Sequence, residues 1–118
     1  MLSEGADYAV EEALPLGAAV EGVRREVLLR AQREAITAYD REHVTPWVRH
    51  ADGVIRAIPL APDDVRGPDL RFTVDTPDDL AYARRLAADL DHQQADPRLA
   101  GLADVIAASR RLVAREVA

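Results

Sequence analysis

The chain has 118 residues, of which 48% are apolar and only 4% aromatic, and its formal net charge is -6 at pH 7. That length suits a single domain, 1–118, with a core that is poor in large side chains. The acidic balance argues against general binding to nucleic acid, which needs a basic face. The absence of cysteine excludes a disulfide framework and a thiolate metal site.

The composition also bears on the compartment. No apolar run approaches the roughly 20 residues that span a bilayer. The first seven residues are acidic and lack the basic-then-apolar order of a signal peptide. We therefore expect a cytoplasmic protein with neither a membrane nor a nucleic acid as its partner.

The first third of the chain predicts two short strands and a helix. Residues 8–10 read as a short strand, and residues 18–23 are compatible with a second, which Gly22 weakens. From Arg25 the apolar residues follow helical spacing. This spacing predicts an amphipathic helix over 25–39.

A broken helix and a strand follow. Asp40 can cap a new helical turn, but Pro46 disfavours helical geometry at the residue before it. Residues 40–50 therefore predict a short broken helix with Trp47 and Val48 packed inward. Residues 54–60 predict a strand, and Pro59 indicates an edge position or the end of that strand.

Residues 71–80 predict a direct passage from strand to helix. Residues 72–74 read as a buried strand that stops at Asp75. Thr76 is a good N-cap, Pro77 suits the first helical position, and Asp79 lies three residues after the cap. This capping-box pattern predicts a helix from Pro77 to about residue 90.

Asp75 has two interpretations. A carboxylate at the C-terminal tip of a core strand lies where α/β proteins usually place their ligands. Alternatively, Asp75 satisfies backbone N–H groups in the turn, as aspartates commonly do.

The last element is a helix. Asp96 and Pro97 repeat the cap-plus-proline start, and apolar residues at helical spacing continue to about Glu116. Residues 97–118 are therefore predicted to add a C-terminal helix. The mixture of strands and helices predicts an α/β class with too few strands for a complete doubly wound sheet.

Two stretches carry a family resemblance. Residues 41–47 read Arg-Glu-His-Val-Thr-Pro-Trp, and residues 71–80 read Arg-Phe-Thr-Val-Asp-Thr-Pro-Asp-Asp-Leu. Both resemble blocks of the sugar cytidylyltransferases of the spore-coat polysaccharide type, relatives of the acylneuraminate and 3-deoxy-manno-octulosonate cytidylyltransferases. A looser third stretch, 17–21, resembles a Gly-x-Asp-Val-Glu segment of the same group, with Ala19 in place of its Asp.

The resemblance implies the C-terminal half of such an enzyme. The implied fold is a partial nucleotide-diphospho-sugar transferase-like (Rossmann-like) sheet with flanking helices, whose N-terminal nucleotide-binding half is missing. The implied reaction joins a sugar or sugar acid to CMP from CTP, with release of pyrophosphate and with the help of Mg²⁺. By motif, Asp75 is the second magnesium ligand, and the first belongs to the missing half.

The resemblance also points to substrate-binding residues, each with a plainer alternative. Glu21 matches a Glu beside the sugar-binding region, or it is a solvated carboxylate at a strand edge. Arg41, Glu42 and His43 line a substrate pocket, or they form an exposed pair and a partly buried hydrogen-bonding histidine. Arg71 contacts a phosphate or carboxylate, or it is the solvated end of a strand.

Three hypotheses follow. The chain is a cytidylyltransferase half that is inactive alone and needs a second polypeptide to supply the nucleotide-binding half. Alternatively, it is a non-catalytic interaction module that covers apolar surface by forming a homodimer or a hetero-oligomer. The third hypothesis is a truncated remnant that still folds.

Overall fold

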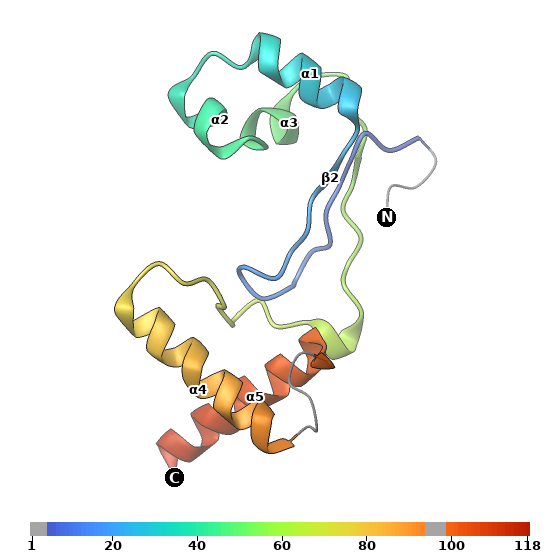
Figure 1. Cartoon of the computed structure of the whole chain (residues 1–118). Helices are drawn as coiled ribbons and strands as arrows, with labels where there is room; N and C mark the ends of the chain where they lie inside the picture. The colour runs from blue at the N-terminus through green and yellow to red at the C-terminus, as the bar shows by residue number, and fades with distance from the viewer. Residues whose placement is uncertain (1–4, 94–98) are drawn as a thin grey trace. The chain divides into compact units, whose positions relative to one another are not determined.

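The computed structural model describes residues 5–93 and 99–118, which divide into two compact units (Figure 1). The first unit contains residues up to Glu12 and Val20–Leu60, and the second contains Ala13–Ala19 and Ala61–Ala118. These described residues form a three-stranded mixed sheet and five α-helices, so the α/β class is confirmed at this level. The predicted start of the last helix at Asp96 and Pro97 lies outside the described residues.

The first unit holds the sheet, whose strands lie in the order β2-β1-β3. Strand β1 (Tyr8–Ala9) is antiparallel to β2 (Gly22–Val23) and parallel to β3 (Arg56–Ala57). A bridge between Glu12 and Leu60 continues the parallel pairing. The three predicted strands are confirmed in place, each shortened, and the edge position predicted from Pro59 is confirmed because β3 ends the strand order.

Helix α1 (Arg25–Glu34) packs its buried Val27 and Ala31 on the sheet residue Tyr8 in one core cluster. The predicted extension of this helix to residue 39 is wrong. Ala35 adopts an extended conformation with ψ 116°, which ends the helix. Thr37 then begins a new helix by accepting a hydrogen bond from the Asp40 N–H at 3.0 Å.

The predicted broken helix is confirmed as α2 (Ala38–His43) and α3 (Pro46–His50). Asp40 does not cap it, because the cap is Thr37 and Asp40 lies inside α2. Between the helices Val44 has φ 65° and ψ -53°, and the Thr45 N–H donates to the His43 carbonyl at 2.7 Å. This is a γ-turn with positive φ, a strained conformation for a β-branched residue.

The second unit begins with an extended ladder between residues 13–16 and 67–72. Leu16 donates to the Leu70 carbonyl at 2.9 Å and accepts from the Phe72 N–H at 2.8 Å. The prediction of a buried strand over 72–74 is wrong. Beyond the Leu16–Arg71 bridge the described residues supply no further strand pairing, and Val74 is 53% exposed.

Two long helices, α4 (Pro77–Gln93) and α5 (Leu102–Val117), complete the second unit (Figure 1). Leu86, Leu90 and Ala108 form the buried contact between them. The same interface buries Asp89, whose side chain is 3% exposed and pairs with Arg111 and Arg115 of α5. The predicted start of α4 at Pro77 is confirmed. Along this helix Leu86 and Leu90 are buried, whereas Leu80 is 42% exposed.

The γ-turn at Val44 gives a test of backbone strain. The Val44→Gly variant should leave the free energy of unfolding unchanged or raise it by about 1 kcal/mol, because relief of strain outweighs the entropic cost of glycine. Urea unfolding followed by the fluorescence of Trp47, the one tryptophan of the chain, reports on this unit. The control is Val20→Gly, at an exposed valine outside the positive-φ region, which should lower stability. Equal losses in both variants would contradict the strain.

Candidate functional site

Glu21 lies in a polar cluster of the first unit, formed with Tyr8 and Arg49. The Tyr8 hydroxyl donates to a Glu21 carboxylate oxygen at 2.8 Å, and Arg49 forms an ion pair with the same oxygen. Tyr8 is 1% exposed, whereas the Glu21 side chain is 21% exposed and that of Arg49 is 53% exposed. The Glu21 carboxylate is therefore mostly buried and fixed by two partners, of which Arg49 is exposed to solvent. We call these three residues the Glu21 cluster.

The electrostatics of the Glu21 cluster fix two protonation states. Burial alone raises the pKa of Glu21, but hydrogen bonds from Arg49, Thr45 and Tyr8 outweigh it and hold the pKa below its ordinary value of 4.5. Burial, and then the bond to Glu21, raise the pKa of Tyr8 above its ordinary value of 10.0. At neutral pH the cluster consequently presents an anionic acceptor, a protonated phenol and a guanidinium.

Three residues of the first family-like stretch, 41–47, lie on α2. Arg41, Glu42 and His43 are all exposed. Arg41 donates to the Ala35 carbonyl at 3.2 Å, and the His43 ring lies 4.5 Å from that of Tyr39. In the described part of the chain no hydrogen bond or ion pair joins Arg41, Glu42 and His43 to one another or to Glu21, so their role in a substrate pocket stays a prediction.

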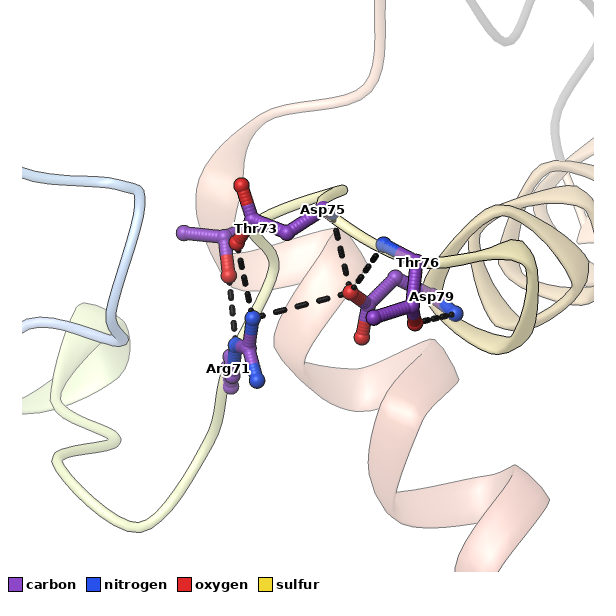
Figure 2. Close-up of polar contacts among 5 residues, drawn as sticks. All are labelled: Arg71, Thr73, Asp75, Thr76 and Asp79. Atoms are coloured by element: carbon purple, nitrogen blue, oxygen red, sulfur yellow. Dashed lines mark hydrogen bonds and ion pairs between the residues drawn. The ribbon is translucent and has the colours of Figure 1, made fainter.

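Asp75 and Arg71 meet in the second unit, at the turn that opens α4 (Figure 2). Arg71 donates to an Asp75 carboxylate oxygen at 2.8 Å and to the Thr73 hydroxyl at 2.5 Å. The Asp75 side chain is 69% exposed and that of Arg71 is 50% exposed. Both predicted residues thus stand in solvent as one ion pair.

Asp79, rather than Asp75, satisfies the backbone of this turn (Figure 2). One Asp79 carboxylate oxygen accepts from the N–H groups of Asp75 and Thr76, both at 2.9 Å, and the Asp79 N–H donates to the Thr76 hydroxyl at 3.2 Å. The predicted capping box is confirmed. The Asp75 N–H, and then the Thr76 hydroxyl, are the main contacts that hold the pKa of Asp79 below its ordinary value.

By itself the turn at Asp75 offers too few protein side chains to surround a metal ion, so further ligands would have to come from a bound phosphate or from water. Among the described residues no group of three or more acidic, histidine or cysteine side chains could hold a metal ion. Mg²⁺ is commonly held by one or two carboxylates together with phosphate oxygens and water. Asp75 offers one exposed carboxylate for that arrangement, with Arg71 as its present partner.

Gly17 of the third motif lies against the second motif. Its φ is 94°, and a Cβ there would stand 2.9 Å from the Thr73 Cγ2 and 3.1 Å from the Thr73 backbone nitrogen. Only glycine fits this position, for reasons of both conformation and space. Two of the three motifs are therefore in direct contact within the second unit.

Sequence reasoning missed Tyr8 and Arg49 as partners of Glu21. Part of the contact with Tyr8 follows from the side-chain period of two in a strand. Tyr8 is paired with Val23, and Glu21, two residues before Val23, lies on the same strand face. Arg49 follows Thr45 by one helical turn, so both approach Glu21 from one side of α3. The contact itself depends on how α3 packs, which local sequence does not specify.

The Glu21 cluster predicts a pH dependence. Because the pKa of Glu21 is lowered on folding, its contribution is fully present above its ordinary value of 4.5 and is lost as the pH falls through the lower folded pKa. Glu21→Gln should therefore cost about 1 kcal/mol or less at neutral pH. This difference from the wild type should vanish in acid. Urea unfolding followed by Trp47 fluorescence measures it, and a difference that persists unchanged at low pH would contradict the assignment.

The hydrogen bonds of the turn at α4 predict different outcomes for substitutions at Asp79 and at Asp75. Asp79→Ala removes the acceptor of the Asp75 and Thr76 N–H groups, so amide exchange at residues 75, 76 and 78–81 should accelerate and helical circular dichroism should fall. Asp75→Ala removes one exposed ion pair and should leave both readouts near wild type. Matching losses in the two variants would show that Asp75 is a structural residue.

Comparison of the chain with protein-family models, with curated proteins and with solved structures finds no match. Within the described residues, no helix is both long and apolar enough to cross a membrane. The chemistry that can be assigned to the chain therefore comes from its own residues, and above all from the Glu21 cluster and the turn at Asp75.

Proposed function

We propose that this chain carries the sugar-binding portion and one metal ligand of a Mg²⁺-dependent sugar cytidylyltransferase. In that reaction a hydroxyl or acid group of the sugar attacks the α-phosphate of CTP, and pyrophosphate leaves. Bound Mg²⁺ supplies charge stabilisation for the phosphates. The proposal includes a Rossmann-like fold for the complete enzyme.

The observation that carries the proposal is the difference in structural role between Asp75 and Asp79. Asp79 accepts the backbone hydrogen bonds that an aspartate at a strand-to-helix turn ordinarily accepts. The Asp75 carboxylate is 69% exposed and is therefore not needed as the acceptor of these backbone hydrogen bonds. An exposed carboxylate in this position supports a ligand role, as the resemblance of residues 71–80 implies.

The neighbouring residues support phosphate chemistry at the same turn. Arg71 contacts Asp75 at 2.8 Å and Asp79 at 3.5 Å, and its side chain is half exposed. A guanidinium exchanges readily between carboxylate and phosphate oxygens, because both accept from its planar fork. Arg71 can therefore bind a phosphate oxygen when the Asp75 carboxylate is engaged elsewhere.

The reaction also needs a phosphate-binding loop and a second metal ligand. In this proposal both come from sequence outside these 118 residues, in the same polypeptide or in another. The isolated chain should accordingly bind nucleotide weakly and release no pyrophosphate.

A second candidate, the interaction module, is favoured by exposed apolar side chains. In the first unit Ile36 is 88% exposed and Tyr39 is 63% exposed, and in the second unit Val74 is 53% exposed. Within each unit these exposed side chains are candidates for a contact surface, because exposed apolar patches mark such surfaces in many proteins. Homodimer or hetero-oligomer formation through them is compatible with the enzymatic proposal.

The metal-ligand role of Asp75 can be tested with Mn²⁺, a paramagnetic ion that shares the oxygen-ligand preference of Mg²⁺. Amide NMR signals of residues 73–76, 78 and 79 should broaden first as Mn²⁺ is added, and more strongly when CTP supplies further oxygen ligands. Asp75→Asn should abolish this local broadening.

The matched control is Asp78→Asn, which removes an exposed carboxylate of the same turn without touching Asp75. It should leave the broadening in place. Broadening that survives Asp75→Asn, or that disappears equally in the Asp78 control, would overturn the assignment.

A further inference from the structure

An open hollow of about 430 Å³ lies in the first unit, beside the Glu21 cluster. Tyr8 and Arg49 of the cluster form part of its wall, together with Arg56 of β3. Glu11 and Glu12 add carboxylates, and Val10 and Ile58 add apolar surface. The hollow thus combines hydrogen-bond donors, acceptors and an apolar wall, as sites for small ligands do.

The positive charge of Arg49 is already neutralised. Its guanidinium forms an ion pair with Glu21, and that hydrogen bond is the leading cause that raises the pKa of Arg49. A ligand carboxylate in the hollow would have to compete with Glu21, a carboxylate fixed by the fold and by Tyr8. Arg49 can still donate a hydrogen bond, but it contributes little net charge to the hollow.

Arg56 is engaged with backbone rather than with acid. It donates to the carbonyls of Val48, Ala51 and Val54 at 2.7–3.0 Å, two of which lie at the end of α3. Its Nε is buried and has no hydrogen-bond partner in the described part of the chain. Arg56 therefore contributes a fixed positive charge to the wall, whereas its buried Nε lies out of reach of a ligand in the hollow.

The lining of the hollow carries more negative than positive charge. Glu11 and Glu12 are exposed, and neither forms an ion pair within the described residues. The positive charge of Arg49 is balanced by Glu21, and histidine is neutral in the formal charge count. Arg56 is then the one positive charge left in the lining against the two carboxylates of Glu11 and Glu12. One negative charge is left in excess, which disfavours an anionic ligand by like-charge repulsion.

We infer that this hollow binds a neutral sugar and discriminates against sugar acids, an inference that rests on the proposed function. Sugar hydroxyls both donate and accept, so they can pair with the exposed carboxylates of Glu11 and Glu12 and with the half-exposed guanidinium of Arg49. The C–H face of a sugar ring can cover Val10 and Ile58. The carboxylate of a sugar acid would meet the excess negative charge.

The experiment compares hexoses with their matched uronates, so that the two members of each pair share their ring hydroxyls and differ at C6, where a carboxylate replaces the neutral hydroxymethyl group. Glucose and glucuronate, galactose and galacturonate, and mannose and mannuronate are added to the chain up to about 50 mM, which covers millimolar affinities. Amide NMR shifts at residues 8–12 and 49–58 report binding in the hollow. We expect at least one neutral hexose to shift these signals more than its uronate does.

The charge origin is tested with the double variant Glu11→Gln, Glu12→Gln. The preference for the neutral sugar over its uronate should narrow by about threefold or more, because the repelling charges are gone. Glu42→Gln, an exposed acid of α2 that does not line the hollow, is the control and should keep the preference. An unchanged preference in the double variant would overturn the charge argument.

The two proposals fail in different ways. Uronates that bind in the hollow better than the neutral hexoses would overturn this inference and leave the cytidylyltransferase proposal standing. If no hexose or uronate shifted these signals, the sugar-binding role would fall together with the inference.

Discussion

The pairing of arginine with carboxylate is the interaction on which the two units depend. The chain has no lysine, so each of its 15 basic side chains is a guanidinium. In the second unit, Asp89 is buried between α4 and α5 and is held by Arg111 and Arg115. The bond from Arg111, more than any other contact, keeps the pKa of Asp89 below its ordinary value. A carboxylate buried in this way is strongly unfavourable without its partners, so the arginines of α5 fix where that helix can pack.

The same chemistry shapes both candidate sites. In the first unit the Glu21–Arg49 pair joins the residue before β2 to α3, beside the hollow for which we infer an excess of negative charge. In the second unit Arg71 holds the exposed Asp75, while Asp79 closes the turn. In the second unit Asp79 is therefore committed to the structure of the turn, whereas the Asp75 carboxylate is exposed. That separation is what connects the local geometry to the proposed nucleotidyl transfer.

Local signals were predictable from the sequence, whereas burial and distant partners were not. The Thr76–Asp79 capping box and the break at Pro46 depend on residues a few positions apart, and both are confirmed. Helix α1 was predicted too long because the Thr37 cap was read as helix interior, although the Thr37–Asp40 spacing carried the signal. The strand over 72–74 is predicted to be buried, but burial depends on what covers a strand, and Val74 is 53% exposed. Tyr8 and Arg49 were missed because tertiary packing brings them to Glu21.

The most direct measurement of the functional assignment is pyrophosphate release from CTP in the presence of Mg²⁺ and a sugar. The chain is assayed alone and together with a separately expressed nucleotide-binding half of a sugar cytidylyltransferase. We expect no pyrophosphate release by the chain alone and release by the combination. Asp75→Asn should abolish that release, whereas Asp78→Asn should retain it. Release by the chain alone, or release by the combination that Asp75→Asn leaves unchanged, would contradict the assignment.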